Sequence, residues 1–159
     1  MRVKPFRLPG TLARISATLP QTPPTLAFCL ALNAMRDRLL TDELASALDG
    51  KMLRLRVNDA GLTLDFTLRR GRFAPRHADL APDLTISATA YDFACLASRS
   101  EDSDTLFFAR RLVMEGDTDL GLLVKNTLDA ADLPAFTMAD LAPHRVLRRV
   151  ASLLHSGRT

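Results

Sequence analysis

The sequence predicts an α/β (α+β) fold in which a mostly antiparallel sheet of about five strands is covered by helices on one side. Two observations support this prediction. Apolar residues alternate with polar ones through residues 52–69, as in strands with one buried face, and apolar residues at helical spacing occur before and after this stretch. The 159 residues fit one domain, and 47% of them are hydrophobic with no tryptophan, so we expect an aliphatic core.

The first part of the chain is predicted to be helical. Apolar spacing indicates a short helix over Thr11–Leu19, a longer one over Pro23–Leu40, and a third over Asp42–Leu48 that ends at Asp49-Gly50. Residues 26–32 are apolar on all sides, but this run measures roughly 10 Å as a helix, against about 30 Å for a bilayer core. We therefore expect a buried helix and not a membrane span.

The middle of the chain is predicted to form the sheet. Asp59-Ala60-Gly61 joins the first two strands as a hairpin, and Arg70-Gly71 makes the next turn. The expected strands are residues 52–58, residues 62–69, a weak strand at Arg72–Ala74, then Leu84–Ala88 and Leu112–Glu115.

The remaining elements are helices with polar caps. Thr89 and Asp92 suit a capping box for a helix over Ala90–Ser98, and Asp104 is expected to cap a short turn. Asp117 or Thr118 is expected to cap a helix that ends at Leu128. After a break at Pro134, a closing helix is predicted over Ala142–His155.

The ends of the chain are basic and its middle is acidic. Residues 1–14 and residues 141–159 each carry four basic residues and no acid. Of the 21 basic residues, these eight leave 13 in the middle against all 18 acids, a net charge of −5 there. Basic ends can bind an anionic membrane surface or nucleic acid, but no nucleic-acid-binding motif is present. We expect transient contact with an anionic membrane and no nucleic acid.

The chain shows no motif of a known catalytic or metal site. His77, His144 and His155 lie outside any nucleophile motif, and zinc-ligand spacings and phosphate-binding glycine loops do not occur. Cys29 and Cys95 lie in apolar segments, which predicts free buried thiols in a reducing cytoplasm. No signal-peptide pattern opens the sequence. These features predict a cytoplasmic protein without catalytic residues, cofactor or metal.

An acidic turn at Glu115-Gly116-Asp117 allows two interpretations. Glu115 and Asp117 could form a carboxylate pair for acid–base chemistry, or Asp117 and Asp119 could stabilise the start of the next helix. The second interpretation is favoured, because the turn lies where a strand passes into a helix. Arg110 and Arg111 could be surface partners of these acids or ligands of a substrate, and the first role is favoured.

The aliphatic residues near this turn also allow two interpretations. Six residues could fill a solid core, or they could line a tunnel for a lipid chain: Leu112, Met114, Leu120, Leu123, Val124 and Leu128. Pattern alone does not separate these two possibilities.

The run DSDTLFFARRLVMEGDTDLGLLVKNTLDAAD, Asp102–Asp132, resembles a characteristic segment of the sterol carrier protein type 2 family of lipid-binding domains, in its branch of bacterial ubiquinone-biosynthesis accessory factors. The family's sheet ends in a strand, a Gly-Asp turn and an amphipathic helix, which Leu112–Glu115, Gly116-Asp117 and Leu120–Leu128 match. The layout is similar from Leu39 to Asp132.

The resemblance implies an apolar cavity between sheet and helices, no catalysis, and binding of the isoprenoid tail of ubiquinone or its precursors. It also implies a role in oxygen-independent ubiquinone synthesis with the partners UbiU and UbiV and with ubiquinone-biosynthesis enzymes. It divides the chain into an N-terminal extension (residues 1–38), a lipid-binding domain (39–132) and a basic C-terminal helix (133–159). The expected lipid-binding residues are Leu64, Phe66, Leu84, Ile86, Phe93, Phe107, Phe108, Leu112, Met114, Leu120, Leu123, Val124 and Leu128.

Two alternatives stay open. The protein could carry phospholipids or fatty-acyl chains in general, or it could be a small lipid hydrolase that uses Cys29 or the Glu115/Asp117 pair. The expected location is the cytoplasm, with peripheral association at the inner membrane.

Overall fold

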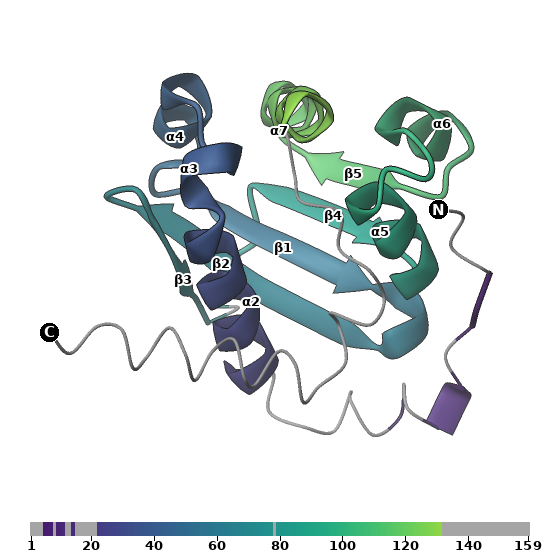
Figure 1. The fold of residues 1–159 in the computed structure, drawn as a ribbon. Helices are drawn as coiled ribbons and strands as arrows, with labels where there is room; N and C mark the ends of the chain where they lie inside the picture. The colour runs from purple at the N-terminus through teal and green to yellow at the C-terminus, as the bar shows by residue number, and fades with distance from the viewer. Residues whose placement is uncertain (1–4, 8, 12–13, 15–21, 78, 132–159) are drawn as a thin grey trace, which may run out of the picture.

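A computed structural model describes residues 5–7, 9–11, 14, 22–77 and 79–131 (Figure 1). The elements, in chain order, are α2 (Thr22–Ala34), α3 (Arg36–Leu39), α4 (Asp42–Leu48), β1 (Met52–Val57), the 3₁₀ turn η1 (Asn58–Ala60), β2 (Leu62–Arg69), β3 (Arg72–Pro75), β4 (Leu84–Ala88), α5 (Ala90–Ala97), α6 (Ser103–Phe108), β5 (Val113–Gly116) and α7 (Thr118–Ala130). The predicted mixed α/β fold with five strands is confirmed.

The five strands form one sheet in the order β3-β2-β1-β4-β5. Three of the four neighbouring pairs are antiparallel, as predicted, and the inner pair of β1 with β4 is parallel. The parallel pair arises because the chain leaves the edge strand β3 and returns to the middle of the sheet. There the Asp83 N–H donates to the Met52 carbonyl at 2.8 Å, and the Met52 N–H donates to the Asp83 carboxylate at 2.7 Å.

The strand register places the large aliphatic residues on one face of the sheet, which we call the helix side. Leu53 of β1 lies between Phe66 of β2 and Leu84 of β4. Helices α2, α4 and α7 pack on this side, and α4, α7 and α6 lie in a row above it (Figure 1). The opposite face carries polar residues, among them the ion pair of Arg54 with Asp65, whose Nε and Oδ1 are 2.6 Å apart.

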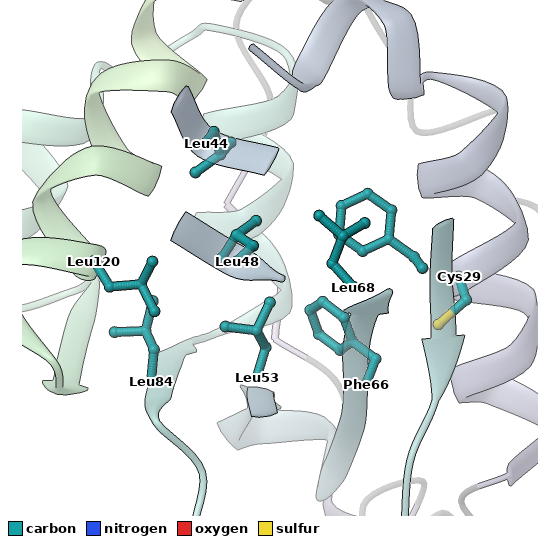
Figure 2. Packing of buried hydrophobic residues seen from close by; sticks show 9 residues of the cluster. Cys29, Leu44, Leu48, Leu53, Phe66, Leu68, Leu84 and Leu120 are labelled. Atoms are coloured by element: carbon teal, nitrogen blue, oxygen red, sulfur yellow. The ribbon is translucent and has the colours of Figure 1, made fainter. Parts of the chain in front are cut away.

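The main core joins the sheet to three helices. Figure 2 shows Leu48 of α4 between Leu120 and Leu84 on one side and Leu68 and Phe66 on the other. A smaller cluster of Ala88, Leu106 and Leu112 attaches α6 to the end of β4. The buried members of the main core are Cys29, Leu44, Leu48, Leu53, Phe66, Leu68, Phe73, Leu84 and Leu120.

The helix predicted over Pro23–Leu40 is broken at Met35, which corrects the sequence prediction. Helix α2 ends at Ala34 and α3 begins at Arg36. Met35 departs from helical geometry, with φ −104° and ψ 5°. Just before it, the Asn33 amide donates to the Phe73 carbonyl and accepts from the Phe73 N–H, each at 2.8 Å. These bonds satisfy backbone groups that β3 would otherwise leave unpaired.

Polar caps begin four helices. Thr41, Thr89 and Asp117 accept hydrogen bonds from the backbone N–H of the third residue after them, at α4, α5 and α7. The cap of α6 is Asp102 and not the predicted Asp104, because Asp102 has the extended backbone that a cap needs.

The other boundaries agree with prediction to within two residues, with the last strand at Val113–Gly116 and its helix reaching Ala130. The predicted helix over Thr11–Leu19 lies mostly outside the described residues, and Pro134 and the helix over Ala142–His155 lie wholly outside them. The division into 1–38, 39–132 and 133–159 stays a prediction. Among the described residues, no helix is long and apolar enough to cross a membrane.

Candidate functional site

The acidic turn between β5 and α7 is built around the helix start. The Asp117 carboxylate accepts a hydrogen bond from the Leu120 N–H at 3.0 Å, and the Asp117 N–H donates to the Asp83 carbonyl at 2.8 Å. The ammonium of Lys51 lies 3.6 Å from Asp83 and 3.9 Å from Asp117. Asp117 is therefore the N-terminal cap of α7, in agreement with the interpretation that this acidic turn stabilises the start of a helix.

Glu115 does not act with Asp117. In the sheet register Glu115 is the partner of Thr85, so its exposed side chain projects from the face opposite the helices. The carboxylate of Asp117 instead turns into the first turn of α7. This arrangement weighs against a carboxylate pair for acid–base chemistry.

Arg111 does not pair with the acids of this turn, contrary to the prediction. Its Nε donates to Asp92 at 2.8 Å and its Nη1 to Glu101 at 2.6 Å, while its guanidinium lies 5.8 Å from the ring centre of Tyr91. The left-handed backbone of Arg110, at φ 56°, turns the chain back toward α5. Hydrogen bonds to Glu101 and Asp92 raise the pKa of Arg111, so it stays charged and braces the loop before α6.

Lys125 is a buried lysine that ties α7 to α6. Its ammonium lies 2.7 Å from Asp104 and 3.4 Å from Asp129, and the Ser103 hydroxyl donates to Asp129 at 2.6 Å. The hydrogen bond with Asp104 raises the pKa of Lys125 in spite of the desolvation that opposes it. The network pairs the lysine with both carboxylates and serves to position α6.

The thiol of Cys29 shows no sign of nucleophilic activation. Cys29 and Cys95 are free and buried, as predicted. Burial raises the pKa of Cys29 to about 11, so the thiol is protonated at neutral pH. The histidine His77 is exposed in the connection between β3 and β4, outside the core that holds Cys29. Within the described residues, no three His, Cys, Asp or Glu side chains gather as a metal site.

An apolar row crosses the middle of the helix side. Leu55, Ile86 and Met114 are register partners on β1, β4 and β5. All three are only half-buried, although β1 and β4 are inner strands of the sheet. By contrast, Leu53 and Leu84, which lie two residues earlier on the same face of β1 and β4, are buried. Ile86 and Met114 pack against both core clusters, so the row lies where the two clusters meet.

Two helices add half-buried apolar side chains next to this row. Leu123 and Val124 of α7 pack against the main core, and Phe93 and Leu96 of α5 pack against the smaller cluster. Sheet and helices together therefore present apolar surface that is partly exposed at the boundary between the clusters. Such a surface can bind hydrocarbon by removing it from water.

Comparison with known proteins identifies the family. The profile of the SCP-2 sterol transfer family matches residues 31–129, which is more than half of the chain. The chain belongs to the SCP-2 sterol transfer family. The match includes the whole sheet, the apolar row and α7 except its last residue.

Three matching proteins are informative. The ubiquinone biosynthesis accessory factor UbiT of Escherichia coli strain K12 is 44% identical over 86 residues, which cover 54% of this chain and 49% of UbiT. The UbiT of Escherichia coli O157:H7 matches to the same extent. The chain thus spans about half the length of the curated relatives it matches. The solved structure of the UbiJ-SCP2 ubiquinone synthesis protein has the same fold, with a TM-score of 0.56, 21% identity, and coverage of 71% of this chain and 100% of that one.

The structure of this SCP-2 family member separates the predicted lipid-binding residues into three groups. The predicted set does not include Leu55 and Leu96, two half-buried apolar residues of this surface, although Leu55 lies on the predicted apolar face between Leu53 and Val57. The buried group is Leu64, Phe66, Leu84, Leu112 and Leu120; the half-buried group is Ile86, Phe93, Met114, Leu123, Val124 and Leu128; and the exposed group is Phe107 and Phe108.

Proposed function

We propose that this protein binds the isoprenoid tail of ubiquinone or of a ubiquinone precursor along the apolar row, and that it is a non-catalytic accessory factor in ubiquinone biosynthesis. The observation that carries the proposal is the half-buried state of Leu55, Ile86 and Met114 in the middle of the helix side. Similarity to UbiT, a ubiquinone biosynthesis accessory factor, and membership in a sterol transfer family support it.

Physical chemistry explains why such a protein is useful. Burying one CH₂ group stabilises by about 0.8 kcal/mol, so each five-carbon isoprene unit left in water costs on the order of 4 kcal/mol. A tail of several units therefore needs an apolar surface whenever its ring is to be modified outside the bilayer. Aliphatic side chains on both the sheet and α7 supply that surface, and because burial of hydrocarbon is not directional, they can accept the tail in several positions.

The chemistry of the site supports a binding role over hydrolysis. The raised pKa of Cys29 opposes nucleophilic attack, and Asp117 is committed to capping α7. UbiU, UbiV and the ubiquinone-biosynthesis enzymes remain the expected partners by resemblance. The domain of residues 39–132 is expected to hold the lipid in the cytoplasm, with transient contact at an anionic inner membrane.

Lipid extraction of the purified full-length protein tests the proposal. We expect native mass spectrometry and solvent extraction to yield a prenylated quinone or a prenylated precursor bound to the folded protein. Recovery of phospholipid or fatty acid alone would replace the quinone assignment by the general carrier alternative. Lipid-free protein that also fails to bind added prenylated quinone would contradict the proposal.

A further inference from the structure

We propose that the turn between β2 and β3 is the surface by which this protein docks on an anionic lipid bilayer, through the phosphates of the lipid headgroups. We call residues 69–72, Arg-Arg-Gly-Arg, the arginine turn. The inference rests on the proposed function and names its partner, because a carrier of a membrane-soluble tail must meet the membrane to load and release it.

The β2–β3 hairpin does not require arginine in this turn. Arg69 and Arg72 are register partners, so two like charges lie directly opposite each other, which weakens the pairing of the strands. Between them, Arg70 has a φ of 51° and Gly71 a φ of 71°, and two-residue turns with this backbone favour Asn or Asp before the glycine. The arginines are therefore unfavourable for the fold, which indicates a role in binding.

The arginine turn carries cations that are available to an anion. Arg69, Arg70 and Arg72 are exposed, and the described residues give none of them an ion pair. The neighbouring carboxylate of Asp49 accepts a hydrogen bond from the Arg70 backbone N–H at 3.1 Å, so it holds the backbone of the turn and not the guanidinium.

Helix α3 adds positive charge beside the arginine turn (Figure 1). The Nη1 of Arg36 donates to the Gly71 carbonyl at 3.3 Å. The ion partner of Arg36 is its exposed neighbour Asp37, and Arg38, also exposed, has no ion pair among the described residues.

The charge of this corner is positive when the neighbouring acids are counted. The five arginines of α3 and the arginine turn lie beside two acids, Asp37 and Asp49, which leaves a net charge of +3. Asp42 and Glu43, which begin α4, would reduce it to +1. At the other edge of the sheet, residues 99–131 carry four basic residues and seven acids, a net charge of −3. An anionic bilayer therefore orients the protein with the arginine turn toward it.

The sheet edge beside the arginine turn is closed to an added strand. The Asn33 amide occupies both the N–H and the carbonyl of Phe73, and Pro75 has no N–H to donate. An acidic peptide therefore cannot bind here by extending the sheet, which argues against this kind of protein partner.

The arginines lie on different sides of the turn. Arg69 and Arg72 are on the face opposite the helices, because their neighbours in the strands enter the core. Arg36 approaches the turn from α3. An acidic protein would have to enclose the turn to meet all of these cations, whereas lipid headgroups are mobile and can gather around it. Since Phe73 is buried, we expect docking by charge and not by insertion of a ring.

Vesicle flotation tests this surface. Each arginine near an anionic membrane contributes about fivefold to affinity, so Arg69→Gln/Arg72→Gln should bind vesicles of phosphatidylglycerol and phosphatidylcholine about 25-fold more weakly. The matched control is Arg99→Gln/Arg110→Gln, which removes two exposed arginines at the acidic edge and should change binding less than about twofold. Arg69→Lys/Arg72→Lys keeps the charge and should keep the affinity.

Arg70→Asn separates binding from folding. Asparagine adopts the left-handed backbone of this position more readily than arginine, so the free energy of unfolding in urea should rise or stay the same. Vesicle binding should nevertheless weaken about fivefold, because one cation is lost.

A dye reports which surface meets the membrane. Because Cys29 and Cys95 are buried, a new exposed cysteine can be labelled selectively. We would label Ala74→Cys on β3 and, as the control, Leu122→Cys on α7, both at exposed positions. Vesicles should shield the dye on β3 from a neutral soluble quencher and leave the dye on α7 accessible.

Several results would overturn the inference. Equal losses for Arg69→Gln/Arg72→Gln and Arg99→Gln/Arg110→Gln would show that net charge alone attracts the protein to vesicles. Displacement from vesicles by inorganic phosphate at constant ionic strength would assign the arginine turn to a soluble phosphate. Failure of the wild-type protein to float would leave an acidic protein as the partner. Prenylated-quinone binding in vesicle-free solution should be unchanged in Arg69→Gln/Arg72→Gln, so a failed docking surface and a failed lipid site are distinguishable.

Discussion

The carbonyl oxygen of Asp83 occupies the space where a Cβ atom at Gly116 would lie. Gly116 also has a φ of 108°, a conformation that side-chain-bearing residues rarely adopt. The same carbonyl accepts the Asp117 N–H at 2.8 Å, so the β5–α7 turn is fitted against the residue that precedes β4. The position and start of α7, and with them one wall of the apolar row, depend on this close approach.

Gly116→Ala is therefore expected to destabilise the protein by about 3 kcal/mol or more, from backbone strain together with displacement of Asp83. Gly71→Ala is the matched control, because Gly71 also has a positive φ, 71°, but no other atom lies within 4 Å of the point that a Cβ there would occupy. It should cost about 1–2 kcal/mol. Urea unfolding compares the two, and equal losses would show that the Asp83 contact is unimportant.

Arg111→Leu is expected to cost about 3 kcal/mol, because Asp92 is buried and would lose its ion partner. The neighbouring substitution Arg110→Leu removes an exposed arginine that has no ion pair among the described residues, and it should change stability by less than about 0.5 kcal/mol. Thermal and urea unfolding of both variants check this. A loss for Arg110→Leu as large as that for Arg111→Leu would argue against the assigned network.

The raised pKa of Cys29 predicts how the free energy of unfolding depends on pH. Burial raises its pKa from 9.0 to about 11, so above about pH 9 the unfolded chain releases a proton that the folded protein keeps. The stabilising contribution is complete below pH 9 and is lost as the pH rises to about 11. Cys29→Ala should lose less stability than the wild type over this interval. If the unfolding free energies of the wild type and of Cys29→Ala fell by the same amount across this interval, the prediction would be contradicted.

Leu123→Glu should weaken binding of a prenylated quinone at least about tenfold, because a carboxylate would be placed beside the apolar row. Since Leu123 is half-buried, the loss of folding stability should be smaller than the loss of binding. Leu122→Glu changes the adjacent, exposed leucine and should leave binding in solution unchanged. Fluorescence titration and thermal melts are run together, and unfolding of Leu123→Glu at ordinary temperature would indicate a solid core instead.

Local chemistry made much of the fold predictable. Alternating residues on both sides of Asp59-Ala60-Gly61 indicated the β1–β2 hairpin, and Thr89 with Asp92 indicated the start of α5. The break at Met35 was not predictable, because no glycine or proline marks it in the sequence. The partners of Arg111 were not predictable from local pattern, because Asp92 and Glu101 lie 19 and 10 residues away in sequence.

The candidate site was predictable in part. The apolar pattern of the strands and of α7 indicated Ile86, Met114 and Leu123, but such a pattern does not predict the exposed fraction of each side chain. The exposure of Phe107 and Phe108 was not predictable, because a six-residue helix is too short for its apolar face to be recognised from spacing. Their exposure depends on Leu106 being the residue that enters the core.

Photocrosslinking tests the central claim most directly, because it reports both binding and position. A prenylated quinone that carries a diazirine on its tail is bound to the full-length protein, activated by light, and located by peptide mass spectrometry. The account predicts labels on the peptides that contain Leu55, Ile86 and Met114, and their loss when excess unlabelled prenylated quinone is added. Labelling confined to other peptides, or labelling that excess quinone does not reduce, would contradict it.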